Sequence, residues 1–305
     1  MYNQFFGNYL FSKGYVTKEH LLSALIRQTK EMVHISMLAL YNGYMSAPEV
    51  EYVTNLQKEE HKKFSEVAIE YGFLSQEQVL SLLNTKAPDF LVLGQILIHD
   101  GVFTFEQFEN ILTDYRSNSE LLDMELNPEN VDEIQQLLNN FSLLSESAIP
   151  EFGKSYLELL FKNFVHYIGD DFTILPPSIC DEFATEHCVS QSINGNYIVN
   201  TYISMSKDTS ITFAERYSGE SFTEYNEYVS ASLEDFINLH NGLFIVNASN
   251  ENSNELTLGI LEPHDNEIVN FKHASFLFPV YYPFGLIYFI MEIVTLSQAD
   301  KYVLD

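Results

Sequence analysis

Asp235, Asn238 and Gly242 follow the spacing D-x-x-N-x-x-x-G, in which the first two carry polar side chains capable of catalysis. Around them, apolar side chains recur at steps of three and four, which predicts an amphipathic helix. Asp235 and Asn238 fall one turn apart on it, so a carboxylate stands beside a carboxamide. Glu234, four residues before Asn238, could share the same face. The candidate site residues are therefore Asn238, Asp235 and Glu234.

Several other chemistries lack the residue patterns they need. The nine histidines form no H-x-x-x-H pair, and no G-x-S-x-G or P-loop spacing occurs. No Ser or Cys nucleophile pattern surrounds His240, so we interpret it as a surface or capping residue. Cys180 and Cys188 are eight residues apart, which fits no zinc pattern. We expect no metal or cofactor of the chain's own.

The segments around the motif predict the elements that must position it. An amphipathic helix is expected from about residue 156 to 167, and a hairpin over 188–203. Gly242 predicts the end of the motif helix. Further strands are predicted at 243–248, 255–261, 275–281 and 286–294. Strands outnumber helices and are mostly linked by hairpins, which indicates an α+β domain with an antiparallel sheet packed on helices.

This ordered set resembles the chemotaxis phosphatases of the CheC/CheX family, whose active helix carries an acidic residue, an asparagine three later and a glycine four after that. Residues 211–216, 256–263 and 278–293 are similar to the family's flanking elements. The resemblance covers about residue 150 to the C-terminus. The family's acidic residue is usually Glu, so Asp235 has one methylene less, about 1.3 Å of reach.

The resemblance implies that the substrate is the aspartyl phosphate of a CheY-type response regulator. Asn238 would orient the attacking water, and Asp235 or Glu234 would pair with a lysine of the regulator, which would carry the magnesium. Such in-line transfer depends mainly on positioning and charge stabilisation. The alternative is a non-catalytic signalling adaptor with a degenerate CheX-like domain. A homodimer through an edge strand is left open, because relatives of this type can dimerise.

The N-terminal third contains a repeat with a period of 29 residues, marked by Gly14, Gly43, Gly72 and Gly101. A Ser or Thr follows each glycine by three residues, and in three units a Glu or Gln follows three later, which predicts a capping box. Apolar residues flank each cap as a hydrophobic staple. The pattern predicts an all-α domain over residues 1–115, built from four helix-turn-helix units.

Units one and two resemble the cyclic di-GMP-binding N-terminal domain of type II secretion and pilus ATPases, the MshEN/GspE N-terminal family. Residues 6–10 and 24–28 carry the likeness. The family's nucleotide-binding units generally open with an Arg before the Leu-Gly, but Gln4, Phe5 and Phe6 stand here. The resemblance therefore implies the fold, and we favour a scaffold or partner-docking module over a cyclic di-GMP site.

Length and composition set the remaining limits. The 305 residues suggest two domains, and 46% hydrophobic residues suffice for their cores. We expect residues 116–150 to be a linker with a short helix between residues 1–115 and 151–305. A net charge of −28 repels nucleic-acid phosphates and anionic headgroups, which disfavours both as partners.

Two features of the sequence predict where in the cell the protein is located. Residues 274–291 carry no charge, but Pro279, Pro283 and Gly285 interrupt them, so two buried strands are expected instead of a membrane span. The N-terminus lacks the basic and apolar regions of a secretory signal, and the chain has only two cysteines. A cytoplasmic protein without membrane insertion is expected.

Overall fold

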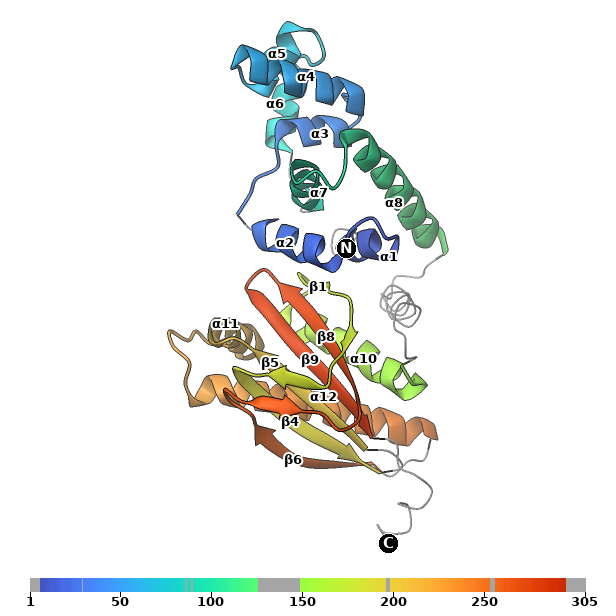
Figure 1. The fold of residues 1–305 in the computed structure, drawn as a ribbon, viewed down its shortest axis with the longest axis vertical. Helices are drawn as coiled ribbons and strands as arrows, with labels where there is room; N and C mark the ends of the chain where they lie inside the picture. Colours follow the sequence, from blue (N-terminus) through green and yellow to red (C-terminus); the bar gives the residue numbers. More distant parts are fainter. Residues whose placement is uncertain are drawn as a thin grey trace. The chain divides into compact units, whose positions relative to one another are not determined.

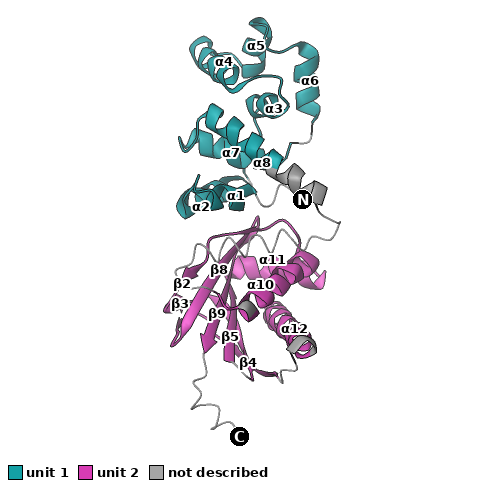
Figure 2. Cartoon of the chain, turned by 90° about the vertical axis from the view of Figure 1, so that its right-hand side faces the viewer, with its two compact units in different colours: residues 1–129 teal, residues 130–305 magenta. Residues whose placement is uncertain are grey.

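The chain divides into two compact units, residues 1–129 and 130–305 (Figure 2). The computed structural model describes residues 6–28, 30–85, 87–88, 90–125, 149–195, 198–252 and 256–294.

The described part of the first unit contains helices and no strands, as predicted. They are α1 (Phe6–Ser12), α2 (Lys18–Gln28), α3 (Ile35–Tyr41), α4 (Ala47–Glu60), α5 (Phe64–Glu70), α6 (Gln76–Asn84), α7 (Phe90–His99) and α8 (Phe105–Glu125). Helix α8 continues through residues 116–125, which were expected to begin the linker, because the segment contains no Gly or Pro to stop it. The predicted linker helix lies outside the described residues.

The glycine stops and the caps of the first unit are confirmed. Gly14, Gly43, Gly72 and Gly101 have φ between +69° and +77°, a backbone conformation that costs glycine little. In three units the cap residue and the residue three positions later exchange hydrogen bonds, which satisfies amides at the helix start. These pairs are Ser46–Glu49, Ser75–Gln78 and Thr104–Gln107.

Helix α7 forms the centre of the first unit, because all of residues 90–97 are buried. It packs against α1 and α2 on one side and against α3 on another (Figure 1). Repeats one and two therefore contact α7, which belongs to repeat four, whereas α5 and α6 of repeat three pack against α4 and α3. A Cβ on Gly94 would overlap two ring carbons of Phe108, so this glycine lets α7 and α8 approach closely.

The second unit is a two-layer α+β domain, with an antiparallel sheet on one side and helices on the other (Figure 2). The strand order of the main sheet is β1-β8-β9-β5-β4-β6, and β2 also pairs with β8; β3 and β7 form a separate pair. The strands are β1 (Thr173–Ile174), β2 (Ser178–Ile179), β3 (Glu182–Ala184), β4 (His187–Asn194), β5 (Ile198–Met205), β6 (Thr257–Pro263), β7 (Ile268–Asn270), β8 (Ala274–Tyr282) and β9 (Gly285–Val294).

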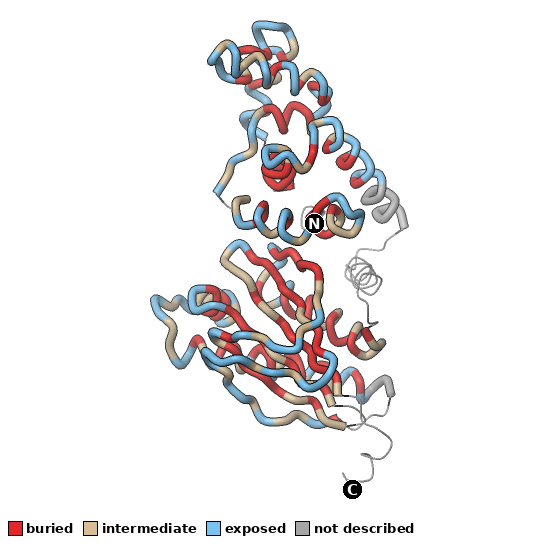
Figure 3. Tube along the Cα trace, in the orientation of Figure 1, coloured by how far each residue is buried: buried red, intermediate tan, exposed pale blue. Residues whose placement is uncertain are grey.

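The helices of the second unit are α10 (Glu151–Asn163), which continues as the π-helical turn η1 (Phe164–Ile168), α11 (Lys207–Ser218) and α12 (Glu227–Asn252). The uncharged residues 274–291 form β8 and β9, which are buried along most of their length (Figure 3). Two buried strands are thereby confirmed. In the part of the chain that is described, no helix is both long and apolar enough to cross a bilayer.

One predicted boundary is wrong: α12 does not end at Gly242, and residues 243–248 are helix and not strand. Phe244 and Ala248 are buried and follow Asn241 at helical steps of three and four. The apolar run is only half-covered, since Val246 is 58% exposed. Tertiary packing of one helical stripe outweighs the strand propensity of the run.

Candidate functional site

Asn238 and Asp235 both lie on the solvent-exposed side of α12. At 100° per residue they are about 60° apart around the helix axis, so their side chains flank one exposed ridge. Phe236 and Ile237, between them in the sequence, are only 1% exposed and anchor the opposite side of the helix. The predicted juxtaposition of a carboxylate and a carboxamide is present on the surface.

A tyrosine from the neighbouring helix holds the Asp235 carboxylate. Tyr217 Oη of α11 donates to Asp235 Oδ2 across 2.7 Å. The tyrosine ring packs at right angles to Phe236 and beside Tyr167, with centroids 5.8 Å away in both cases. Burial and the carboxylate together raise the pKa of Tyr217, so it stays a donor at neutral pH.

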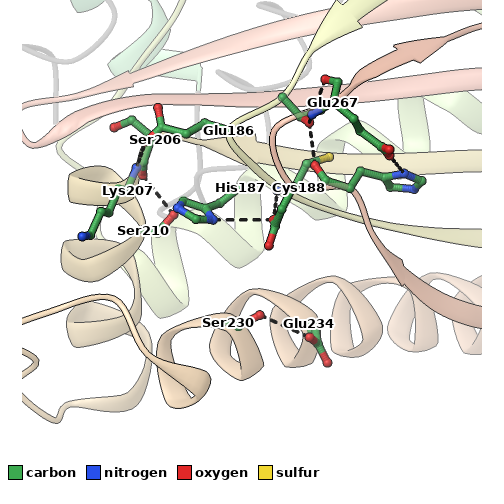
Figure 4. A network of polar contacts seen from close by, with 12 residues as sticks. Glu186, His187, Cys188, Ser206, Lys207, Ser210, Ser230, Glu234 and Glu267 are labelled. Atoms are coloured by element: carbon green, nitrogen blue, oxygen red, sulfur yellow. Dashed lines mark hydrogen bonds and ion pairs between the residues drawn. The ribbon is translucent and has the colours of Figure 1, made fainter.

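Glu234 is also close to Asn238, about 40° from it around the helix axis, but on the opposite side from Asp235. It is half-buried, and Ser230 Oγ donates to its Oε1 over 3.4 Å (Figure 4). This contact is at the limit of a hydrogen bond. The two carboxylates therefore flank Asn238, and Asp235 is the more exposed and the more firmly held.

Gln191 of β4 contacts Asn238 from beneath. Its Nε2 donates to Asn238 Oδ1 at 2.9 Å and to the Gly259 carbonyl of β6 at 3.2 Å. Only 3% of Gln191 is exposed. This residue was not among the predicted site residues, because it lies 47 positions before Asn238 and belongs to no local pattern. The one sequence signal is that Gln191 lies between Val189 and Ile193 at alternating positions of the strand, which places a polar residue on the same face as two buried apolar ones.

His240 and Asn241 are fully buried, so the interpretation of His240 as a surface or capping residue is wrong. Asn163 Nδ2 lies 2.9 Å from His240 Nδ1, and because an amide nitrogen only donates, the ring proton sits on Nε2. Among the described residues, Nε2 has no hydrogen-bond partner. Burial lowers the pKa of His240 to about 3, and an uncharged ring this deep is no general base at the surface.

A second polar chain lies on the other face of β4. Ser190 Oγ is 2.8 Å from His264 Nε2, and His264 Nδ1 is 2.5 Å from Glu267 Oε1. The order resembles that of a serine-hydrolase triad. Ser190, however, is 7% exposed in the middle of a strand that is paired on both sides. We interpret these contacts among Ser190, His264 and Glu267 as structural, because they hold the loop after β6 against β4.

The arrangement on α12 presents one carboxamide held by its oxygen and one carboxylate held by a phenol. Such a pair can position a water or a cationic side chain, and it contains no hydroxyl or thiol nucleophile. Within the described residues, no group of three or more His, Cys, Asp or Glu side chains is placed to hold a metal ion.

Comparisons with known proteins return solved structures of chemotaxis proteins. Neither a family model nor a curated protein matches the chain. A CheC-like superfamily protein from Shewanella is similar with a TM-score of 0.41 and 13% identity, over 47% of this chain and 96% of that one. CheX from Desulfovibrio desulfuricans gives 0.41 and 11%, over 47% and 99%. The CheX–CheY–BeF3–Mg complex from Borrelia burgdorferi gives 0.42 and 14%, over 47% and 98%.

Proposed function

We propose that the second unit is a phosphatase that hydrolyses the aspartyl phosphate of a CheY-type response regulator. The observation that carries the proposal is the pairing of exposed Asn238 and Asp235 on α12, each held by a separate buried or half-buried partner. Asn238 would orient the attacking water in line with the acyl phosphate. The regulator would supply the magnesium and the phosphoryl group, so the chain itself needs only positioning groups.

Asp235 is the carboxylate that we assign to the regulator's lysine. It lies on the outward ridge of α12, whereas Glu234 is half-buried and turned toward Ser230. A carboxylate exposed before docking can reach a cation on a partner without breaking packing. The Tyr217 hydrogen bond fixes one oxygen and leaves Oδ1 for the lysine.

Exposed apolar side chains continue the ridge and suit a docking surface. Tyr228 and Val246 are 64% and 58% exposed and lie on the same outward side of α12 as Asp235. At Gly242, one turn after Asn238, the position that a Cβ would take has no atom within 4 Å. A partner could thus approach the backbone of α12 closely beside the catalytic amide.

The test is the loss of phosphate from a purified, magnesium-bound, phosphorylated CheY-type regulator of the same organism. Wild type should accelerate it, and Asn238→Ala should reduce kcat by about 100-fold, the effect of losing one positioning group. Asp235→Ala should lower kcat/KM about 10-fold through weaker docking. Glu234→Ala is the matched control on the same helix turn and should change kcat/KM less than about 3-fold.

Two outcomes would contradict the proposal. If folded wild type gives no acceleration with any CheY-type regulator tested, the second unit is the non-catalytic adaptor. If Glu234→Ala is the damaging variant and Asp235→Ala is neutral, the assignment of the carboxylate is wrong while the phosphatase stands. A homodimer through the β6 edge is a separate hypothesis, to be checked by sedimentation.

A second candidate function belongs to the first unit. A cavity of about 900 Å³ lies among α2, α3, α4, α5, α7 and α8, a size typical of small-ligand sites. Basic and imidazole side chains line part of it, and aromatic rings line another part. They are Arg27, Lys58, His34 and His99, with Phe64, Phe103 and Phe105. The carboxylates of Glu31 and Glu51 also line the cavity, and Glu31 pairs with Arg27 at 3.1 Å. We propose it as the place where a cyclic dinucleotide would bind if this unit is a ligand sensor.

Calorimetry with cyclic di-GMP tests the second candidate directly. Binding that is lost in Lys58→Ala and kept in Lys18→Ala, a lysine outside the cavity, would support the sensor. Arg27 is a less clean probe because it also bonds Asp100 at 2.8 Å. Absence of binding at millimolar ligand would leave the first unit as a scaffold or partner-docking module.

A further inference from the structure

The Gln191 side chain joins the exposed Asn238 to a fully buried polar cluster. On one side its Nε2 bonds Asn238 Oδ1, and on the other its Oε1 accepts from Asn241 Nδ2 at 3.0 Å. Asn241 in turn donates to Thr201 Oγ1 at 3.0 Å and accepts from Tyr156 Oη at 2.5 Å. The Asn238 side chain is thus the solvent-exposed end of a series of hydrogen bonds that continues into the core.

Two backbone carbonyls, which can only accept, fix the direction of this chain. Gly259 O lies 3.2 Å from the end of Gln191, so that end must be the amide nitrogen, and Asn238 must then turn its oxygen toward it. At the inner end, Thr201 Oγ1 donates its one proton to the backbone carbonyl oxygen of Gln191 at 2.9 Å. It can therefore only accept from Asn241, which places Nδ2 there. The contact with the Gly259 carbonyl and the contact with Thr201 therefore give the same direction of donors and acceptors along the chain of hydrogen bonds.

The geometry points to Gln191 as a positioning residue for Asn238, an assignment that rests on the proposed phosphatase. A free asparagine amide can turn over and expose either its oxygen or its nitrogen. Here Oδ1 is held by Gln191, so Nδ2 and its two protons face the incoming regulator, together with the remaining lone pair of Oδ1. Nδ2 can donate to a phosphoryl oxygen while that lone pair accepts from the attacking water.

Gln191→Met tests the assignment, because it keeps the length of the side chain and removes the donor. We expect kcat to fall about 3- to 10-fold with KM for the phosphorylated regulator unchanged, the loss of one orienting hydrogen bond. In an Asn238→Ala background the same change should cause no further loss. Ser232→Ala is the control: Ser232 is 8% exposed and bonds only a carbonyl of its own helix, so its removal should not alter kcat.

Gln191→Glu gives a pH-dependent effect on kcat that would not be expected if Gln191 only stabilised the fold. As a carboxylate it cannot donate, so Asn238 should turn its nitrogen inward and kcat should fall. When protonated, its O–H can again donate to Asn238 Oδ1, so the ratio of variant to wild-type kcat should rise as pH is lowered. The side-chain amide resonances of Asn238 should shift in the same pH range.

The outcomes separate this assignment from the proposed function. If wild type does not exceed the rate of Asn238→Ala, the phosphatase is wrong and the assignment falls with it. If wild type is active and Asn238→Ala is not, but Gln191→Met keeps full kcat, only the role of Gln191 is wrong. A Gln191→Met loss that persists in the Asn238→Ala background would likewise overturn it.

Discussion

Tyr217 on α11 donates a 2.7 Å hydrogen bond to Asp235 on α12, and this contact sets the direction of the candidate carboxylate from a second helix. The phenol is itself held, because its ring packs on Phe236 and beside Phe213. An exposed aspartate would otherwise sample several rotamers. Docking a lysine onto a carboxylate that is already oriented costs less side-chain entropy.

In the proposed phosphatase, Tyr217→Phe should therefore weaken docking of the regulator without removing the carboxylate. The ring and its packing stay, and only the hydrogen bond is lost, so we expect kcat/KM to fall about 3- to 10-fold. The free energy of unfolding of the second unit should fall by about 0.5–1.5 kcal/mol. In an Asp235→Ala background the substitution should change kcat/KM by less than about 2-fold. An equal loss in both backgrounds would show that Tyr217 acts independently of Asp235.

Gly242 and Gly219 form a matched pair with opposite expectations. Neither has an atom within 4 Å of the position that a Cβ would take, but Gly219 has φ +75° at the end of α11, whereas Gly242 lies within α12. Gly242→Ala should stabilise the second unit by about 0.5–1 kcal/mol, because alanine is the better helix former. Gly219→Ala should destabilise it by about 1–2 kcal/mol, because alanine resists a left-handed conformation.

Hydrogen exchange of α12 amides measures both changes, since it reports the opening of the second unit alone. Gly242 also allows a test of docking. The bulkier Gly242→Leu should raise KM for the regulator, because it fills the space beside Asn238 on the outward face. If Gly242→Leu leaves KM unchanged while Asn238→Ala abolishes catalysis, the regulator does not approach α12 along that turn.

Local patterns predicted much of this structure. The glycine stops and capping boxes of the first unit depend on residues three to six positions apart, and the register of Asp235 with Asn238 depends on one helix turn. These are short-range effects that a sequence expresses directly. The α+β class likewise followed from hairpin-linked strands.

The contacts that complete the site are long-range and were not predictable. Gln191 contacts Asn238 from a strand, and Tyr217 contacts Asp235 from a neighbouring helix. No local pattern in the sequence shows which polar residues of other elements will contact α12. The burial of His240 was missed because the helix was expected to end at Gly242, which made His240 a terminal residue of the helix. The strand predicted after Gly242 failed since periodicity alone cannot tell a short apolar run in a helix from a buried strand.

Gly94→Ala should destabilise the first unit at least as much as a substitution at a glycine stop. The added Cβ would overlap the Phe108 ring, and both α7 and the ring are buried, so the helices must separate. We expect a loss of about 1–3 kcal/mol, the cost of overpacking a close-packed interface. Gly43→Ala, where no atom lies within 4 Å, is the comparison and should cost about 1–2 kcal/mol from backbone strain alone. Amide exchange in α7 would measure both; an unaffected α7 in Gly94→Ala would show that the ring can move aside.

His240 should make the second unit less stable in acid. Its pKa is about 3 in the fold and near 6.5 when the chain is unfolded, so between these values the unfolded chain binds a proton that the folded chain does not. Stability therefore falls as pH drops below 6.5, by up to about 1.4 kcal/mol per pH unit. His240→Gln keeps an acceptor for Asn163 but cannot titrate, so its stability should vary less between about pH 7.5 and 5. Parallel slopes for wild type and His240→Gln, from amide exchange in α12, would mean that the buried ring is protonated in the fold.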